Sequence, residues 1–168
     1  MGFHQISIGE CNENFISALH DRYSLVTSTW EGKTNMLTVA WAQVGHLWQM
    51  PVATAYIRPS RYTKEFMDKS GRFTMCFFDA SHHDDLIYLG RHSGRDEDKL
   101  AKTSLHLLDV DGDKIYEEAE LALICKTLYV QQIDLSCLLD KTIETTHYAE
   151  GNVSYEYIGE IEKVLVND

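Results

Sequence analysis

Short runs rich in β-branched and aromatic residues, divided by turn residues, constrain the fold of this chain more than any other feature of its sequence. Residues 23–30 (Tyr-Ser-Leu-Val-Thr-Ser-Thr-Trp) form one such run, and residues 35–44 form the next. The intervening Glu31-Gly32-Lys33 supplies a turn, so the two runs predict a β-hairpin. A third run over residues 51–57 ends at Pro59, which cannot donate a hydrogen bond to a strand ladder. The first part of the chain is therefore expected to be antiparallel β structure.

Signals for short helices interrupt the strands. Ser60 can cap a helix over residues 61–70, and Ser81 can begin a second helix that ends at Gly90. Further strands are expected at residues 73–78, 120–134, 135–139 and 155–166. These elements predict a mainly β barrel with short α inserts. The chain has no internal repeat and no linker rich in Pro, Gly or Ser, so we expect one domain over residues 1–168.

The charge of the chain excludes two classes of partner. Its 168 residues include 15 Lys and Arg against 26 Asp and Glu, a formal net charge of −11. Such a surface repels phosphate backbones and anionic lipids, so we expect no nucleic acid and no membrane partner. The N-terminus lacks a signal-peptide pattern, and the longest apolar run, residues 121–125, is too short to cross a bilayer. The four cysteines form no CxxC pair, so free thiols and a cytoplasmic location are expected.

The charge is unevenly distributed along the chain. Residues 58–102 hold 9 of the 15 cations and 8 acids, a local net charge of +1, which leaves −12 for the rest. A segment with this charge can arise by chance about as readily as through a function. The functional alternative is a binding site for a small anionic ligand.

Metal and hydrolase chemistry find little support in the motifs. Residues 109–120 have the acid spacing of a calcium loop, but Lys114 occupies the position of the required glycine, which favours a solvated hairpin tip. There is no HExxH motif, and the adjacent His82 and His83 point to different faces of a helix. We therefore expect no metal site. The Gly-x-Ser-x-Gly motif and the glycine loops of P-loop and Rossmann proteins are also absent.

Three segments combine polar, cationic and aromatic groups at expected strand ends: residues 35–41 (NMLTVAW), 58–63 (RPSRYT) and 89–99 (LGRHSGRDEDK). Taken singly, they are a strand, a capped helix entry and an exposed turn. Together they suit a phosphorylated, planar aromatic ligand. Arg58 and Arg61 can fork onto phosphate oxygens, and Thr63 can add a hydroxyl near a helix N-terminus, which favours an anion.

The first of these segments has polar residues on both of its expected faces. Strand alternation places Asn35, Leu37, Val39 and Trp41 on one face and Met36, Thr38 and Ala40 on the other. We therefore expect that the two faces cannot both be packed only in a core. Trp41 taken alone is typical of a core or rim aromatic.

The order of the three segments, with Trp48 between the first two and Tyr155-x-Tyr157-x-Gly159-Glu160 near the end, resembles the flavin reductase-like, flavoredoxin-type FMN-binding split barrel family. The resemblance covers residues 23–161. It implies a Greek-key split barrel that forms a homodimer, with one FMN near each subunit interface. It also implies that the cofactor-binding residues are Asn35, Met36, Thr38, Ala40 and Trp41 at the ring and ribityl chain, Arg58, Arg61, Tyr62 and Thr63 at the phosphate, and Ser93, Arg95 and Lys99 closing the site.

The resemblance implies an FMN oxidoreductase, and three functions follow from it or compete with it. The first is an NAD(P)H-dependent flavin reductase in which NADH or NADPH delivers hydride to flavin N5, with no catalytic side chain required. The second is a flavoredoxin-like electron carrier without its own nicotinamide site, whose acidic surface docks a basic redox partner protein. The third is a non-redox split-barrel ligand-binding module. A purified protein that is colourless and takes up no FMN would exclude the first two.

Overall fold

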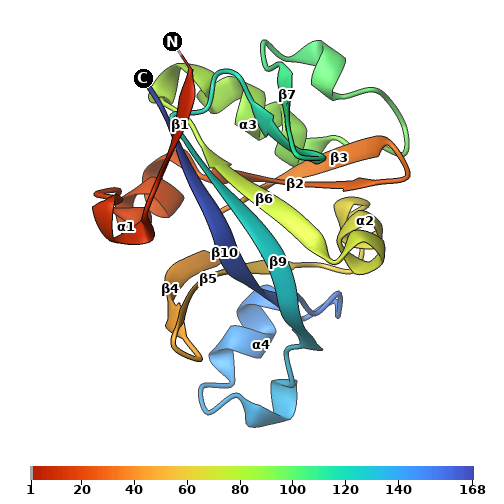
Figure 1. Ribbon diagram of the computed structural model, residues 1–168. Coiled ribbons are helices and arrows are strands. Elements are labelled where there is room, and N and C mark those ends of the chain that lie inside the picture. The colour runs from red at the N-terminus through yellow and green to blue at the C-terminus, as the bar shows by residue number, and fades with distance from the viewer. Residues whose placement is uncertain (1) are drawn as a thin grey trace.

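The computed structural model describes residues 2–168 (Figure 1). Its strands are β1 (Phe3–Ile6), β2 (Ser24–Trp30), β3 (Lys33–Val39), β4 (Ala42–Leu47), β5 (Met50–Ile57), β6 (Arg72–Phe77), β7 (Leu107–Val110), β8 (Asp113–Tyr116), β9 (Leu121–Gln132) and β10 (Tyr155–Asn167). Eight strands form one antiparallel sheet in the order β3-β2-β6-β9-β10-β5-β4, with β1 beside the second half of β10. Strands β7 and β8 form a separate hairpin.

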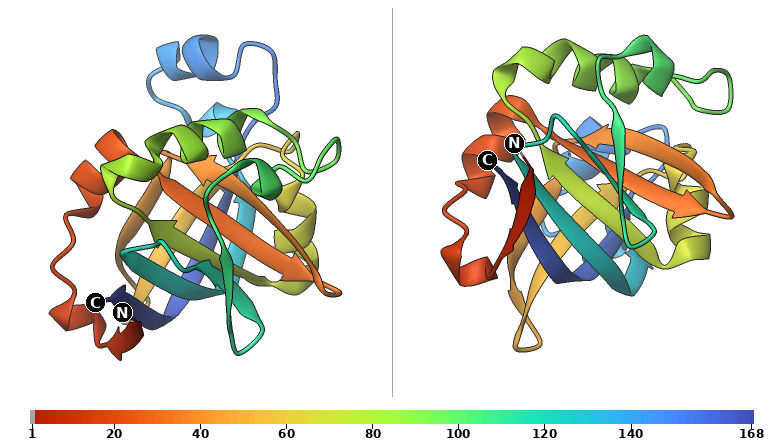
Figure 2. Two further views of the ribbon diagram at one scale, coloured as in Figure 1. Left: turned by 90° about the horizontal axis from the view of Figure 1, so that it is seen from above. Right: turned by 45° about the horizontal axis from the view of Figure 1, so that its top comes forward.

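Short helices lie around this sheet. They are α1 (Phe15–Ser17), α2 (Thr63–Ser70), α3 (His83–Arg91) and α4 (Thr142–His147). Single helical turns lie at Ile8–Glu10, Ala18–Arg22, Ala80–His82, Leu100–Lys102 and Leu135–Cys137. Helix α3 packs on β3, and α4 lies at the opposite end of the barrel (Figures 1 and 2). No helix in the described part of the chain is both long and apolar enough to span a membrane.

The two edges of the sheet meet at one point of the chain. Strands β3 and β4 are the first and last in the sheet order, yet only Ala40 and Trp41 separate them in sequence. The Cα atoms of Val39 and Ala42 are three residue steps apart and so at most about 11 Å from each other, which requires the sheet to curl until its edges meet there. The backbone oxygen of Trp41 also accepts a hydrogen bond from the backbone N–H of Tyr56 at 3.1 Å, which ties the junction to β5. No ladder pairs β3 with β4 among the described residues, so the barrel closes only at this junction and is open along the rest of these two strands. This is the mainly β split-barrel class expected from the sequence.

Two hydrophobic clusters hold the barrel together, one inside it and one between the sheet and α3. Leu25 and Val26 are adjacent in β2 and both are fully buried, because they face the outer and inner clusters respectively. In β3, Leu37 packs in the inner cluster and Met36 in the outer one. The expectation that both faces of this strand cannot be packed in a core is therefore wrong at Met36 and Leu37, because α3 and the β7–β8 hairpin cover the outer face.

Several predicted boundaries differ in the structure. Residues 35–44 are two strands, because the chain bends at Ala40 and Trp41 to cross from one sheet edge to the other. Helix α2 begins two residues later than expected, and Ser60 does not cap it. The Ser60 hydroxyl instead accepts a hydrogen bond from the Asn152 amide at 3.0 Å.

The expected strand at residues 135–139 is wrong. A helical turn forms there because the Asp134 carboxylate accepts a hydrogen bond from the Ser136 backbone N–H at 2.9 Å. The hairpin tip expected at residues 109–114 is confirmed, and Lys114 Nζ lies 2.6 Å from a carboxylate oxygen of Asp109.

Candidate functional site

A cleft follows the edge of β3 that does not pair with β2. It has three chambers, and a central one shares lining residues with each of the other two. The central chamber is lined by residues 35, 37, 60–63, 91–94 and 99. The Trp41 chamber is lined by residues 37–41, 56, 58, 61 and 154. The loop chamber is lined by residues 32–36, 62, 66, 94–100, 107 and 114. We call the three together the β3 cleft.

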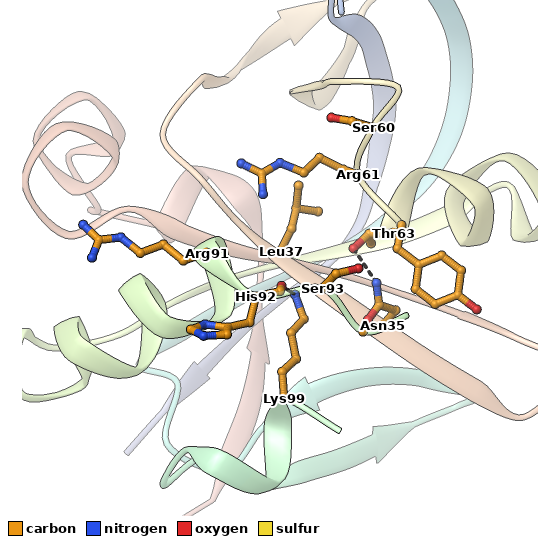
Figure 3. Close-up of a pocket in the computed structure, with 11 residues that line it drawn as sticks. Asn35, Leu37, Ser60, Arg61, Thr63, Arg91, His92, Ser93 and Lys99 are labelled. Carbon is orange, nitrogen blue, oxygen red and sulfur yellow. Dashed lines mark hydrogen bonds between the residues drawn. The ribbon is translucent and has the colours of Figure 1, made fainter. Parts of the chain in front are cut away.

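The central chamber is cationic. Arg61 precedes α2, Arg91 ends α3, and Lys99 follows in the next loop, and all three line this chamber without any Asp or Glu (Figure 3). Thr63, the first residue of α2, also lines it, so the positive end of that helix dipole faces the cavity. Several cations, a helix N-terminus and no opposing carboxylate are the features of an anion site.

A tight contact between three segments shapes the chamber wall. The Asn35 amide nitrogen on β3 donates to the Thr63 hydroxyl on α2 at 2.9 Å, and both side chains are buried (Figure 3). A Cβ atom added at Gly94 would overlap the Asn35 side-chain oxygen. Only glycine therefore fits at position 94 without displacing Asn35.

Lys99 is a buried cation at the end of α3. Lys99 is only 4% exposed, and its Nζ atom donates hydrogen bonds to the backbone oxygens of Leu89 at 2.7 Å and His92 at 3.0 Å. Burial, with a smaller contribution from nearby Arg61, lowers the pKa of Lys99 from 10.5 to about 8. The negative end of the α3 dipole partly compensates for burying the charge. The ammonium group is thus held in place before any ligand arrives.

Two arginines connect the segment before α2 to the end of α3 and to the loop that follows it. Arg61 Nη1 donates to the backbone oxygen of Gly90 at 2.8 Å. Arg95 stacks 4.6 Å from the ring centre of Tyr62, donates to the backbone oxygen of Ser60 at 3.2 Å and forms an ion pair with Glu65. Arg95 therefore fastens the loop to α2 and lines the loop chamber rather than the central one.

Arg58 is directed toward α4. Its guanidinium carbon lies 5.5 Å from the ring centre of Trp41 and 5.6 Å from that of Tyr148, and Nη2 donates to the backbone oxygen of His147 at 3.0 Å. These contacts hold α4 against the junction of the two sheet edges. Arg58 consequently lines the Trp41 chamber and does not line the central one.

All twelve residues predicted from the sequence line the β3 cleft, but besides Arg58 and Arg95 two more of them, both on β3, have side chains engaged within the protein. Met36 packs in the outer core, and the Thr38 hydroxyl bonds to the backbone oxygen of Leu86. Their backbone groups are the parts suited to hydrogen-bond a ligand. Arg91, His92 and Gly94 also line the cleft and were not predicted, although all three belong to the LGRHSGRDEDK segment. Ser154 lines the Trp41 chamber, and the sequence carries no signal for it.

The donor set of the cleft fits a phosphorylated ligand with a flat ring. The central chamber offers three cations and hydroxyl groups for a phosphate. The two neighbouring chambers continue along an unpaired strand edge, whose backbone groups can hydrogen-bond the polar edge of a heteroaromatic ring, and the Trp41 chamber adds an exposed indole. The fold and the cleft together describe a split-barrel protein with a cationic cleft whose donors suit an anionic ligand.

The comparisons place the chain in a family. Residues 16–161 match the model of the flavin reductase like domain, so the chain belongs to the flavin reductase-like family. No curated protein gives a significant match.

Solved structures share the fold. A flavoredoxin from Methanosarcina acetivorans is similar with a TM-score of 0.69 and 18% identity, over 88% of this chain and 69% of that one. An FMN-binding domain of a flavin reductases-like enzyme from Shewanella baltica has a TM-score of 0.70 and 16% identity, over 98% and 77%. A flavoredoxin of Desulfovibrio vulgaris has a TM-score of 0.66 and 22% identity, over 87% and 69%.

Proposed function

We propose that the protein binds FMN in the β3 cleft and acts as an NAD(P)H-dependent flavin oxidoreductase. The observation that carries FMN binding is the central chamber, which gathers Arg61, Arg91 and Lys99 without a carboxylate in a chain of net charge −11. Membership of the flavin reductase-like family supports the redox function. NADH or NADPH is the proposed hydride donor.

The proposed binding residues divide among the chambers. The phosphate is assigned to the central chamber, where Arg61, Thr63 and Lys99 supply donors. The remaining proposed contacts are Asn35, Met36, Thr38, Ala40 and Trp41 along the ring and ribityl chain, Arg58 and Tyr62 near the phosphate end, and Ser93 and Arg95 in the closing loop. In the light of the structure, Arg58 and Arg95 act mainly by holding α4 and the loop in place.

Bound FMN supplies a hydride acceptor at its N5 atom. The chain contributes orientation and electrostatics: the free edge of β3 near Thr38 offers backbone N–H donors that can stabilise negative charge on a reduced ring. Such donors raise the reduction potential. No side chain has to transfer a proton in this step, so we propose no catalytic residue.

A flavoredoxin-like electron carrier is the second candidate function. The fold shared with two flavoredoxins favours it, and so does the acidic net charge, which would attract a basic redox partner. Such a carrier binds FMN but has no nicotinamide site. A non-redox split-barrel module, the third candidate, would not retain FMN.

Reconstitution followed by anaerobic reduction tests these candidates. We expect ligand-free protein to take up FMN and become yellow, and NADH or NADPH to bleach the bound flavin much faster than free FMN. FMN uptake with reduction no faster than that of free FMN would support the carrier. Failure to take up FMN would overturn both flavin functions.

A single domain, a homodimer and a cytoplasmic location stay predictions. Light scattering of the FMN-loaded protein measures the subunit number. A monomer that retains FMN tightly would contradict a site that depends on a subunit interface.

Replacing Gly94 with alanine is expected to weaken FMN binding by about three- to tenfold. The new methyl group must displace the Asn35 side chain and so disturb its hydrogen bond to Thr63, a contribution of about 0.5–1.5 kcal/mol. Fluorescence titration measures the dissociation constant. Gly9→Ala is the matched control, because a Cβ there meets nothing within 4 Å. Equal affinities of the two variants would show that the Asn35 position does not matter for binding.

A further inference from the structure

The Trp41 chamber contains a polar side chain with no partner in the protein. Ser154 lines this chamber and is fully buried, and its Oγ atom has no hydrogen-bond partner among residues 2–168. The other hydroxyl-bearing or charged side chains of the chamber each have one, namely Thr38, Tyr56, Arg58 and Arg61. Buried hydroxyl groups nearly always have a partner, because leaving one unpaired is unfavourable relative to water. Ser154 therefore has an unused hydrogen-bonding hydroxyl in the wall of the Trp41 chamber.

Hydrogen bonds at Ser154 itself and at Asn152, two residues earlier, fix the backbone of this loop. The Ser154 backbone oxygen accepts a hydrogen bond from the Ile133 N–H at 3.0 Å. Two residues earlier, Asn152 has a left-handed φ of 55° and exchanges two hydrogen bonds with Ser60, at 3.2 and 3.0 Å. Asparagine tolerates this backbone conformation better than most residues do. The same contacts that fix this loop thus also attach it to the segment that carries Arg61.

A second unpaired hydroxyl shows that burial alone does not indicate a ligand. Thr127 Oγ1 is also buried without a partner among the described residues, but Thr127 lines none of the three chambers. Ser154 combines the unpaired hydroxyl with a position in the wall of the cleft. Thr127 therefore serves as a matched control.

We propose that Ser154 is a further residue of the flavin site, whose hydroxyl donates a hydrogen bond to a nitrogen or oxygen acceptor of the isoalloxazine ring. The inference rests on the proposed function and on the assignment of Thr38, Ala40 and Trp41, which line the same chamber, to the ring. Reduction adds negative charge to these ring acceptors, so a donor stabilises the reduced form more than the oxidised form. Ser154 then sets the potential of the flavin as well as its affinity.

The test is the Ser154→Ala variant with FMN as the probe. We expect oxidised FMN to bind about three- to tenfold more weakly, the effect of one neutral hydrogen bond. Reduced FMN should lose more affinity than oxidised FMN, which moves the midpoint potential of the bound flavin to a more negative value. Fluorescence titration and spectroelectrochemistry measure these quantities. The melting temperature of the ligand-free variant should be unchanged or higher, because the substitution removes an unpaired buried group.

The control is Thr127→Val, which removes the other unpaired hydroxyl and should leave both FMN affinity and potential unchanged. If wild-type protein binds FMN and Ser154→Ala changes neither quantity, this inference fails and the proposed function stands. A lower melting temperature of the ligand-free Ser154→Ala variant also overturns it, because the hydroxyl would then have a partner within the protein. Wild-type protein that takes up no FMN overturns the inference and the proposed function together.

Discussion

Replacing Arg61 with alanine is expected to weaken FMN binding by about 10- to 100-fold and to leave riboflavin binding unchanged. Arg61 lines both the central and the Trp41 chamber, and its guanidinium is held toward the cavity by its bond to the Gly90 backbone oxygen. A hydrogen bond to a charged group contributes about 1.5–3 kcal/mol, which corresponds to about a 10- to 100-fold change in the dissociation constant. Riboflavin has the same ring and ribityl chain without the phosphate, so it separates a phosphate contact from a ring contact. Parallel fluorescence titrations with the two ligands measure both effects.

Two further variants define the role of Arg61. Arg61→Lys should show an intermediate loss, because lysine keeps the charge but lacks the planar fork that binds two phosphate oxygens. Lys102→Ala should bind both ligands like wild type, since Lys102 is exposed and lines none of the chambers. An equal loss for FMN and riboflavin in Arg61→Ala would contradict the phosphate assignment.

Replacing Lys99 with methionine is expected to weaken FMN binding by about tenfold or more and to destabilise the fold. Methionine fills a similar volume but removes the charge next to the central chamber. It also leaves the backbone oxygens of Leu89 and His92 without their buried donor, which costs about 1–3 kcal/mol. Denaturant unfolding measures the stability, and FMN titration of the folded variant measures the affinity. Lys99→Gln restores a donor without the charge, so it should recover stability more than affinity.

The same lysine predicts a pH dependence. Its pKa of about 8 in the folded protein means that the ammonium loses its proton as the pH rises through this value. A phosphate monoester is already doubly charged well below pH 8, since its second pKa is about 6. FMN affinity of the wild type should therefore fall above pH 8, and that of Lys99→Gln should not. A wild-type affinity that is constant from pH 7 to about 9.5 would exclude a contribution from the Lys99 charge.

The stability of the ligand-free protein should show the opposite trend. An unfolded chain keeps the Lys99 proton up to its ordinary pKa of 10.5, whereas the fold releases it near 8. Between these values the unfolded state binds more protons, so the contribution of this group to the free energy of unfolding rises with pH. Below pH 8 both states are protonated and the contribution is constant. Comparing wild type with Lys99→Gln isolates this effect.

Several strands could be predicted from the sequence because their residues are buried on one or both faces. β2, β5, β6, β9 and β10 all coincide with runs of β-branched and apolar residues. Strand β1 was not predicted, because its few residues pair with the far end of β10 and its stability comes from a partner more than 150 residues away. The apolar pattern of residues 135–139 predicted a strand. A helical turn forms there instead, because the cap from Asp134 outweighs that pattern.

Part of the site could be predicted for the same local reason. The RPSRYT and LGRHSGRDEDK segments each contain closely spaced cations, and the structure places both of them along the β3 cleft. Which cation faces which chamber could not be predicted. Arg58 turns to α4 through its contacts with Trp41 and Tyr148, whereas Arg91 at the end of α3 is exposed and lines the central chamber at its rim.

The sequence by itself determined the strand pattern, the cationic segment within an acidic chain and the motifs of the family. The tertiary structure alone decided where the barrel splits, how deeply Lys99 is buried and that the Ser154 hydroxyl is left unpaired beside the cleft. Strand patterns and local charge depend on residues near one another in the chain. Burial and hydrogen-bond partnership depend on which distant segments pack together, and the loss of water that changes a pKa or leaves a hydroxyl without a partner exists only in the packed protein.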